Sequence, residues 1–483
     1  MESPPQAAAS AAASRPRREL AILLLAGAVL FTANARELSL PALDDCFYAR
    51  KAVEMERSGH FFTVTWADRP AFQNPPLQIW LTARSFALFG ENDLAARLPS
   101  ILMALGTLAG TYRIAQLTVG PAAGVGAAAL LLLSPTFVNH ARRSMLEMPL
   151  AFWVLVAVLV LIEGLRHPRR HGWFALPLAA AILTKSVLGL LPLGVLFAGA
   201  VASPVLRASL RRGWIWLGIV GGLALGGSWT LHQYLVFGPA AVRAHYLDEI
   251  VARSTQPLAL GQLLLGYPLA LLASYQPVIL PGALGAAALF RRWREDPRDP
   301  SCLLPIWVAL PTVLYSLSSA RSARYLFPVF PALALCASHW ITARFPRFAV
   351  ALRTAVAPAA ALVAAAILWV RPAMLVAAGT AFFKDDRVIE GRVPEGEPIT
   401  YLGSRADYWA LANPILYYTE RPLEAPRDSA ADALRAAAAR RSGLVLVQRS
   451  RQGELEGTGY AVVLERPDWL LVQPHFDRGR SSD

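Results

Sequence analysis

Residues 147–170 read EMPLAFWVLVAVLVLIEGLRHPRR. An acid opens the segment, a run of apolar side chains follows, and Arg166, Arg169 and Arg170 close it. A helix needs about 20 mostly apolar residues to cross the hydrocarbon core of a bilayer. Loops on the cytoplasmic side carry the excess of arginine and lysine. The segment therefore predicts a membrane-spanning helix with Arg166 at its cytoplasmic end and Glu147 at its outer end.

The composition of the whole chain agrees with this prediction. Of its 483 residues, 55% are hydrophobic and only 16% are charged, whereas soluble proteins carry about 25% charged residues. The net charge of +13 sits in short clusters between apolar runs, which is typical of membrane-protein loops rather than of a nucleic-acid-binding surface. The three cysteines form no CxxC pattern, and no HExxH or G-x-x-x-x-G-K-[ST] motif occurs. A soluble enzyme, a zinc hydrolase and a nucleotide-driven protein are therefore excluded.

The apolar runs predict a polytopic α-helical membrane protein of about 11 spans. The runs are 20–33, 97–117, 121–138, 147–165, 172–184, 187–204, 214–236, 259–290, 302–319, 325–342 and 348–371. We expect the fifth and sixth runs to form a helical hairpin with Thr184-Lys185-Ser186 at its tip. Ala33-Asn34-Ala35 resembles a signal-peptidase site, but we favour an uncleaved first span.

The arginine-rich loops define the orientation. With the N-terminus in the cytoplasm, four such loops all lie inside: 166–170, 207–212, 291–294 and 344–347. The odd number of spans then leaves the C-terminus outside. We predict three parts: a disordered basic cytoplasmic tail (1–18), a membrane domain (19–371) whose first outer loop is 36–96, and an outer-face, periplasmic α/β domain (372–483). In the last part we expect strands at 399–402 and 444–447, helices at 405–419 and 428–440, and a hairpin at 460–473.

Several cations lie on the outer side in this topology, against the usual bias. They are Arg142, Arg143, Lys185, Arg243, Arg253, Arg321 and Arg324. Charge close to the hydrocarbon is costly, so these residues point to an anionic partner, most simply a phosphate. The alternative is that some of them are long side chains at helix ends that reach back to water.

The first outer loop contains a pair of acids, Asp44-Asp45, at the start of a helix predicted to end at Ser58-Gly59. An apolar strip containing Cys46 and Ala49 suggests that this helix lies along the membrane surface. Asp44, Tyr48 and Lys51 share another face. The acids have two interpretations. They form a helix N-cap, or one is a general base that the other orients or with which it holds a divalent cation.

Spaced motifs along residues 20–335 resemble those of the polyprenyl-phosphate-dependent glycosyltransferases with the GT-C fold. The most similar pattern is that of the protein O-mannosyltransferase and lipid A aminoarabinose transferase group. The motifs are Asp44-Asp45, Tyr48, Gly59, Asn74-Pro75-Pro76-Leu77, Trp80, Phe89-Gly90, Ala96-Arg97-Leu98-Pro99-Ser100, Glu147-Met148-Pro149-Leu150, Thr184-Lys185-Ser186 and Arg324-Tyr325-Leu326-Phe327-Pro328. The chain departs from the pattern at three positions: Asn74 often is a lysine, Ser186 usually a glycine and Glu147 usually an aspartate.

The resemblance implies an integral inner-membrane glycosyltransferase. It would move a sugar from a polyprenyl-phosphate donor, such as an undecaprenyl-phosphate sugar, to a hydroxyl of a lipid, glycan or protein acceptor, with inversion at the anomeric carbon. Modification of lipid A is one such reaction. The sequence names neither the sugar nor the acceptor, and no cofactor beyond a candidate divalent cation.

Each candidate residue receives a role from this chemistry. Asp44 is the expected base, and Asp45 and Glu147 orient it or join it as ligands of the divalent cation. The expected donor-phosphate ligands are Lys185, Arg324, Tyr325 and one of Arg142 or Arg143, and the expected substrate-binding residues are Tyr48, Asn74 and Arg321. For Glu147 and Lys185 the alternative is a purely structural role at helix ends. We expect Tyr267 and Tyr275 to be interfacial aromatics.

The competing function is a lipid-linked sugar transporter without transferase chemistry. Transporters commonly contain broken helices in corresponding positions of two repeats. The two halves of this chain contain no such pair, and the polar residues gather toward the outer surface. A glycosyltransferase is therefore the favoured prediction.

Overall fold

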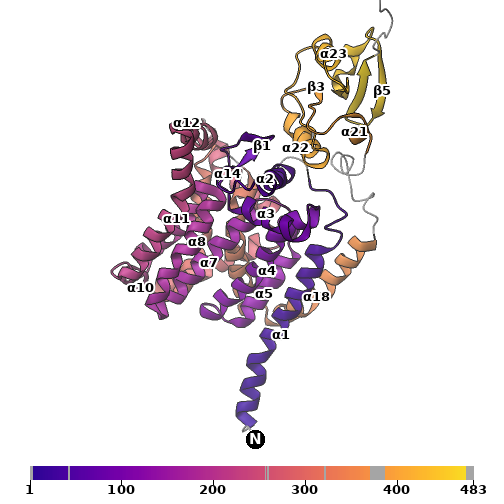
Figure 1. Cartoon of the computed structure of the whole chain (residues 1–483). Helices are drawn as coiled ribbons and strands as arrows, with labels where there is room; N and C mark the ends of the chain where they lie inside the picture. Colours follow the sequence, from indigo (N-terminus) through magenta and orange to yellow (C-terminus); the bar gives the residue numbers. More distant parts are fainter. Residues whose placement is uncertain are drawn as a thin grey trace, which may run out of the picture.

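The computed structural model describes residues 4–41, 44–255, 257, 260–319, 322–369 and 387–474. A bundle of helices forms the larger part of the molecule, and a small α/β domain lies at one end of it (Figure 1). The beginning of the first helix, α1 (Pro4–Thr32), lies at the opposite end (Figure 1).

Six helical segments in the described residues are long and apolar enough to cross a membrane, or up to eight if each of two bent pairs is one span. The six are α4 (Asp93–Leu117), α7 (Glu147–Arg166), the run Pro168–Ala202, α11 (Gly213–Phe237), the run Ala323–Arg344 and α18 (Pro346–Trp369). The bent pairs are α5 (Pro121–Leu133) with α6 (Pro135–Ala141), and α14 (Leu260–Ser274) with α15 (Ile279–Glu295). The bundle is thus that of a multi-pass membrane protein, as expected from the composition.

The remaining helices of this part are shorter, apart from α1. They are α10 (Pro204–Ser209), α12 (Pro239–Arg243), the π-helix η3 (Ala244–Val251), α13 (Ala252–Ser254), η4 (Pro300–Cys302) and α16 (Leu303–Ser316). The predicted run 20–33 lies in α1, and the predicted run 302–319 corresponds to η4 and α16. Neither of these segments is among the six to eight candidate spans.

The N-terminal segment differs from the prediction. We expected a disordered tail over residues 1–18, but α1 begins at Pro4 and continues without a break to Thr32. Six of the residues between positions 7 and 13 are alanine, the residue with the highest intrinsic helix propensity. The helix that contains the apolar run 20–33 therefore begins before this run, at Pro4.

The predicted hairpin is present. The run Pro168–Ala202 consists of η1 (Pro168–Phe174), α8 (Ala175–Lys185), η2 (Ser186–Leu190) and α9 (Leu191–Ala202). Ser186 has a positive φ of 41°, and after this turn Gly189 lies against the end of α8. A Cβ atom on Gly189 would lie 2.3 Å from the carbonyl carbon of Ala181. The chain therefore reverses at Lys185–Ser186, which puts Lys185 at the tip.

The first outer loop is an ordered layer above the bundle, formed by α2 (Asp44–Ser58), the short strands β1 (Thr65–Trp66) and β2 (Arg69–Pro70), and α3 (Leu77–Phe89). As predicted, α2 ends at Ser58, and Gly59 follows with a φ of 70°. The expected contact of its apolar strip with the membrane was wrong. Cys46 and Ala49 are fully buried in one apolar cluster with Ile79 and Phe86 of α3, because the loop folds onto itself.

The C-terminal domain contains the elements that the sequence predicted. Its sheet has the strand order β3-β4-β6-β5, in which β3 and β4 are parallel and the other neighbours antiparallel. The strands are β3 (Thr400–Leu402), β4 (Val445–Gln448), β5 (Tyr460–Glu465) and β6 (Trp469–Pro474), and the helices are α21 (Arg387–Arg392), α22 (Tyr408–Thr419), α23 (Ala430–Ala438) and η6 (Arg449–Leu455).

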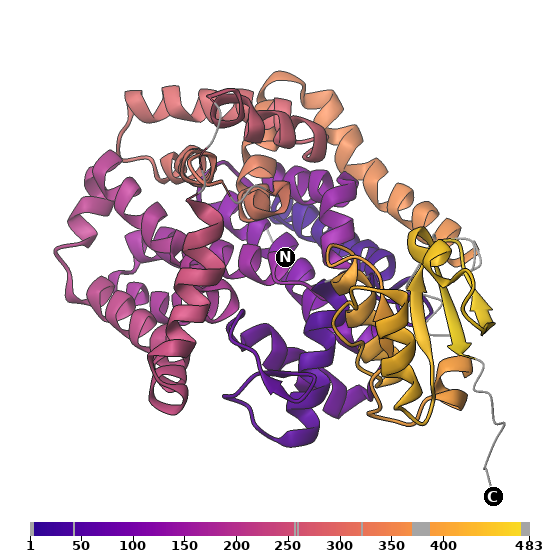
Figure 2. The same cartoon turned by 90° about the horizontal axis from the view of Figure 1, so that it is seen from above.

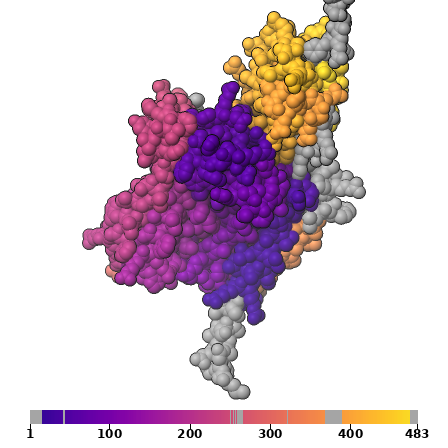
Figure 3. All heavy atoms as spheres, in the orientation of Figure 1, coloured from indigo at the N-terminus to yellow at the C-terminus, as the bar shows by residue number. Residues whose placement is uncertain are grey.

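This domain lies beside the first outer loop (Figures 2 and 3). Arg57, in the last turn of α2, donates to both carboxylate oxygens of Glu420 at 2.8 Å, directly after α22. The hydroxyl of Tyr418 contacts Asp93 at 3.1 Å and accepts from the backbone N–H of Leu40 at 2.6 Å. Polar contacts therefore fix α22 against α2.

Candidate functional site

A cavity of about 840 Å³ opens between the ends of the bundle helices, the first outer loop and the C-terminal domain. Most of the predicted site residues line it: Asp44, Tyr48, Asn74, Glu147, Lys185, Arg324 and Tyr325. They come from α2, the loop before α3, the start of α7, the end of α8 and η5 (Ala323–Val329). This arrangement agrees with the topology expected from the arginine distribution.

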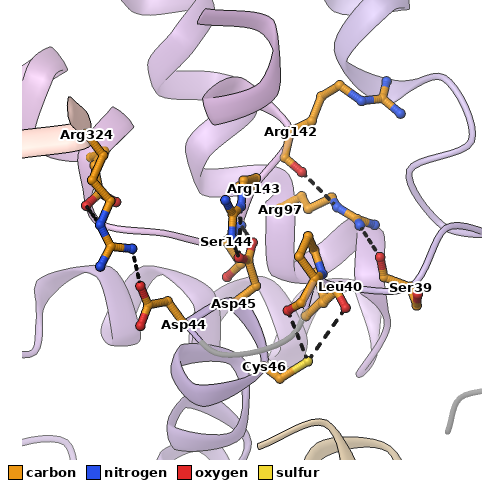
Figure 4. Close-up of polar contacts among 12 residues, drawn as sticks. Ser39, Leu40, Asp44, Asp45, Cys46, Arg97, Arg142, Arg143, Ser144 and Arg324 are labelled. Atoms are coloured by element: carbon orange, nitrogen blue, oxygen red, sulfur yellow. Dashed lines mark hydrogen bonds and ion pairs between the residues drawn. The ribbon is translucent and has the colours of Figure 1, made fainter. Parts of the chain in front are cut away.

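The charged side chains of the cavity form a continuous chain of contacts. Arg324, in η5 (Ala323–Val329), donates through Nη1 to Oδ2 of Asp44 (Figure 4). Its Nε lies 3.8 Å from Oε1 of Glu147, and Lys185 Nζ donates to the same oxygen at 2.8 Å. Two cations and two carboxylates therefore balance one another in the cavity.

Two polar atoms of these ion pairs can still form a hydrogen bond. Within the described part of the chain, Oε2 of Glu147 and Nε of Arg324 are buried and have no hydrogen-bond partner. The ring of Tyr325 lies under both cations, with its centre 4.8 Å from Lys185 Nζ and 5.8 Å from the Arg324 guanidinium carbon. Lys185 and Arg324 both line the cavity, and side chains of these two types commonly bind anionic oxygens.

Glu147 and Lys185 also suit the helix ends on which they stand. Glu147 is the first residue of α7 and Lys185 the last residue of α8. An acid is favoured at the N-terminus and a cation at the C-terminus of a helix, because the helix dipole has the opposite sign there. Glu147 and Lys185 therefore have the structural roles considered from the sequence, and both also line the cavity.

Asp45 does not line the cavity, and its carboxylate points toward Arg143 and Ser144 (Figure 4). It is fully buried and accepts from Arg143 at 2.6 and 3.0 Å and from the backbone N–H of Ser144 at 2.8 Å. Burial raises the pKa of Asp45, while Arg143 opposes this shift. Successive residues of a helix point about 100° apart, so Asp44 and Asp45 face different surroundings. The expected contribution of Asp45 to the chemistry has no support in this geometry.

The two arginines after α6 do not line the cavity either, so the expectation that one of them binds the phosphate is not supported. Arg143 pairs with Asp45. Arg142 donates to the carbonyls of Leu30 and Ala33 at the end of α1. Its own carbonyl accepts from Arg97 at 2.9 Å (Figure 4). These arginines join α1, α4 and the start of α2. Arg321 lies outside the described residues.

Lys51 stands behind the cavity wall. It is fully buried, and its Nζ lies 3.3 Å from Oδ1 of Asn74 and 3.7 Å from the ring centre of Phe47. Asn74 lines the cavity at the position where the resembling family often has a lysine. The buried cation Lys51 therefore contacts Asn74, which lines the cavity.

The three carboxylates do not form a metal site. Among the described residues, no group of three or more His, Cys, Asp or Glu side chains could hold a metal ion. Asp44 and Glu147 both contact Arg324, and Asp45 is turned away toward Arg143. The donor set proposed from the sequence therefore does not fit a divalent cation.

Other residues of the cavity were not identified from the sequence. Tyr267, expected to be an interfacial aromatic, lines the cavity, and so do His245 of η3 and Trp409 and Asn413 of α22. His245 Nε2 lies 2.6 Å from Ser186 Oγ, and burial lowers its pKa. These residues come from segments without a motif, so only the fold brings them to the cavity.

Comparisons with known proteins were made for the sequence and for the fold. Residues 73–229 match the family described as dolichyl-phosphate-mannose-protein mannosyltransferase. An uncharacterized protein of Aquifex aeolicus is 25% identical over 335 residues, which are 68% of this chain and 64% of that protein. An undecaprenyl phosphate-alpha-4-amino-4-deoxy-L-arabinose arabinosyl transferase of Pseudomonas paraeruginosa is 27% identical over 347 residues, which are 68% of this chain and 60% of the relative. The match thus spans less than two thirds of either relative.

Two solved structures have a similar fold. ArnT from Cupriavidus metallidurans bound to undecaprenyl phosphate superposes with a TM-score of 0.73 at 20% identity, covering 94% of this chain and 97% of that chain. The oligosaccharyltransferase of Archaeoglobus fulgidus in the apo form superposes with a TM-score of 0.59 at 13% identity, covering 89% of this chain and 69% of that chain. These likenesses show the fold.

Proposed function

We propose that this chain, which has the GT-C fold and resembles the polyprenyl-phosphate-dependent glycosyltransferases, is an integral membrane enzyme that transfers a sugar from a polyprenyl-phosphate donor. The observation that carries the proposal is the cavity itself. It is lined by two carboxylates and two cations and also by a group of apolar side chains. A lipid-linked sugar phosphate likewise has a charged part and an apolar part.

The donor phosphate would bind between Lys185 and Arg324. Both cations line the cavity, and the buried Nε–H of Arg324 has no acceptor within the described residues. Charge-assisted hydrogen bonds from arginine and lysine to phosphate are strong. The same two cations would stabilise the negative charge that develops on the leaving phosphate as the glycosidic bond breaks.

The lipid chain of the donor would lie along the apolar wall. Val187, Leu188 and Leu191 of the hairpin form one side of this wall, and Ile250 and Leu314 form part of another. The hairpin tip carries Lys185 next to these residues. The phosphate site and the lipid groove are therefore adjacent in the sequence as well as in space.

Asp44 would act as the general base. In the transfer, a hydroxyl oxygen of the acceptor attacks the anomeric carbon, its proton passes to Asp44, and the bond between that carbon and the phosphate oxygen breaks with both electrons going to the phosphate. The products are the glycosylated acceptor and the polyprenyl phosphate. Attack from the side opposite the phosphate would invert the anomeric carbon, as the family resemblance implies.

Binding of the donor would also release the proposed base, Asp44, from its hydrogen bond with Arg324. In this structure Arg324 occupies Oδ2 of Asp44. A phosphate group that binds Arg324 competes with Asp44 for the guanidinium, and an oxygen released in this way can accept the acceptor's proton. Glu147 would keep Lys185 and Arg324 in place during this exchange, because it is almost fully buried and contacts both.

The site would lie on the periplasmic face of the inner membrane, with the N-terminus in the cytoplasm. The distribution of arginines supports this orientation. Trp293 donates to the carbonyl of Ala202 at 3.2 Å and Arg113 donates to Glu163 at 2.9 Å, so that the predicted inner ends of several spans contact one another. The C-terminal domain lies at the other end (Figure 1), and its residues Trp409 and Asn413 line the cavity.

Mass spectrometry of lipid and glycan fractions tests the proposal. Cells that contain the wild-type protein are compared with cells that contain the Asp44→Asn variant. We expect one class of molecule to carry an added sugar only with the wild type, and that class identifies the acceptor. Identical fractions, with a polyprenyl-phosphate sugar redistributed between the two leaflets, would contradict the proposal and favour a transporter.

A further inference from the structure

The C-terminal domain contributes two residues to the wall of the cavity, although its sequence contains no catalytic motif. They are Trp409 and Asn413 of α22. The two residues are four positions apart, and side chains at this spacing share one face of a helix. The domain therefore takes part in forming the site.

Trp409 belongs to a series of aromatic rings that crosses from this domain to the first outer loop. Its ring centre lies 5.2 Å from that of Trp66, and Trp66 lies 6.3 Å from Phe47 on α2. Phe47 and Trp409 both line the cavity. Trp409 is 47% exposed, so part of its ring surface is accessible to a molecule in the cavity.

The hairpin that carries Trp66 turns through two residues with a positive φ, as a two-residue turn of this kind requires. Ala67 and Asp68, its two central residues, have φ values of 52° and 59°. Asn and Gly are preferred in such turns, because other residues pay about 1–2 kcal/mol each for this conformation. The carboxylate of the buried Glu54 accepts from both backbone N–H groups, at 2.9 and 3.3 Å. A buried carboxylate thus holds a strained turn whose effect is to place Trp66 between Phe47 and Trp409.

We propose that Phe47, Trp409 and Asn413 form the subsite that binds a sugar ring of the acceptor, so that the acceptor is a glycan or glycolipid. A pyranose ring packs a face of C–H groups on an aromatic ring, and its hydroxyls bond to a side-chain amide, which donates and accepts. The subsite combines these two elements. This inference rests on the proposed transferase function and names the class of its acceptor.

The position relative to the charged residues assigns the ring to the acceptor rather than to the donor. Phe47 follows Asp44 by three residues on α2, so the two side chains are neighbours on its surface. The sugar of the donor must lie between the phosphate-binding cations and the base. The aromatic residues lie where the first outer loop contacts the C-terminal domain, and Trp409 is half exposed, so we assign them to the acceptor.

Saturation-transfer NMR on the full-length protein tests this subsite. The protein is kept in a detergent without a sugar headgroup, and the probes are the methyl pyranosides of glucosamine, glucose and mannose. We expect transfer to the ring C–H protons of at least one probe, reduced about fivefold in Trp409→Ala. Trp214→Ala is the control, because Trp214 on α11 is similarly exposed, at 44%, and does not line the cavity. Absence of transfer to all three probes in the wild type, or equal transfer in both variants, would overturn the proposal.

Further variants separate this inference from its alternatives. Trp409→Phe should keep most of the signal, and Asn413→Ala should weaken it. The test therefore still gives a result if Trp409→Ala fails to fold. The signal should persist with undecaprenyl-phosphate mannose bound, and loss of the signal would assign the subsite to the sugar of the donor instead. Binding of undecaprenyl phosphate should be lost in Lys185→Ala and kept in Trp409→Ala. If Lys185→Ala binds it normally, the proposed donor site fails, whatever the pyranosides do.

Discussion

Arg324 donates a hydrogen bond to the carboxylate of Asp44, although the two residues are 280 positions apart in the sequence. The contact joins η5 to the first residue of α2. Because Arg324 also faces Glu147, it connects the proposed base with the cations that would hold the phosphate. The next four predictions concern the parts of this arrangement and its surroundings.

Replacing Arg324 with alanine should weaken the binding of undecaprenyl phosphate by about tenfold or more, because a charge-assisted hydrogen bond to the phosphate is lost. Native mass spectrometry of the full-length protein with increasing undecaprenyl phosphate measures the change. Arg347→Ala is the control, because Arg347 is exposed and belongs to a predicted inner loop. Equal affinity in both variants would show that Arg324 does not bind the phosphate.

Glu147→Gln should lower the thermal stability of the protein, whereas Glu147→Asp should lower it less. Glu147 is almost fully buried and accepts from Lys185 at 2.8 Å. Removing one partner of a buried pair costs about 3–5 kcal/mol, since the other charge is left without compensation. Aspartate retains the charge, and it is the usual residue at this position in the resembling family. Thermal unfolding curves that rank the two variants in the opposite order would contradict this account of Glu147.

The two neighbouring acids show what the sequence could predict and what it could not. Asp44, Glu147, Lys185 and Arg324 were assigned to one face because topology depends on apolar runs and arginine positions, which are local signals. Asp45 could not be distinguished from Asp44, because its role depends on contact with Arg143, 98 residues away. A sequence pattern does not contain such a contact.

The same reason explains the aromatic residues. The helix that contains Trp409 was predicted, as was the fold of its domain. Its approach to Trp66 and Phe47 depends on how the domain packs against the first outer loop, through pairs such as Arg57 with Glu420. Local propensity predicts an element, but not the element against which it packs.

Arg143→Ala should destabilise the protein without affecting the binding of undecaprenyl phosphate. The fully buried Asp45 would lose its cation, at a cost of about 3–5 kcal/mol when it is charged. Burial already raises the pKa of Asp45 above its ordinary value. A carboxyl group with a raised pKa in the folded state loses stability as the pH rises through that pKa. The deficit of the variant should therefore grow with rising pH.

Unfolding followed at several pH values, together with titration of undecaprenyl phosphate, checks this prediction. Adding Asp45→Asn to the variant should remove this additional pH dependence, because position 45 no longer carries an ionisable group. Loss of lipid-phosphate binding in Arg143→Ala at unchanged stability would instead assign Arg143 to the donor site.

The contact between α2 and the C-terminal domain should become less stable at acidic pH. Hydrogen bonds from Arg57 lower the pKa of Glu420 to about 2. A carboxylate with a lowered pKa contributes stability above its unfolded value, and this contribution is lost as the pH falls toward the folded value. The protection factors of the α22 amides, which correct the exchange rate for its intrinsic dependence on pH, should therefore fall between about pH 4.5 and 2 in the wild type. They should fall less over that range in Arg57→Ala, and equal decreases would contradict the role of this pair.

The most direct test of the account is sugar transfer by Asp44→Asn in reconstituted membranes with the donor and acceptor found by mass spectrometry. Asparagine keeps the size of the side chain but cannot accept the proton, and a positioned general base contributes about 10²–10⁴-fold to a rate. We predict a loss of transfer of this size, with binding of undecaprenyl phosphate retained because Arg324 remains available. Transfer at the wild-type rate would contradict the assignment of Asp44 as the base.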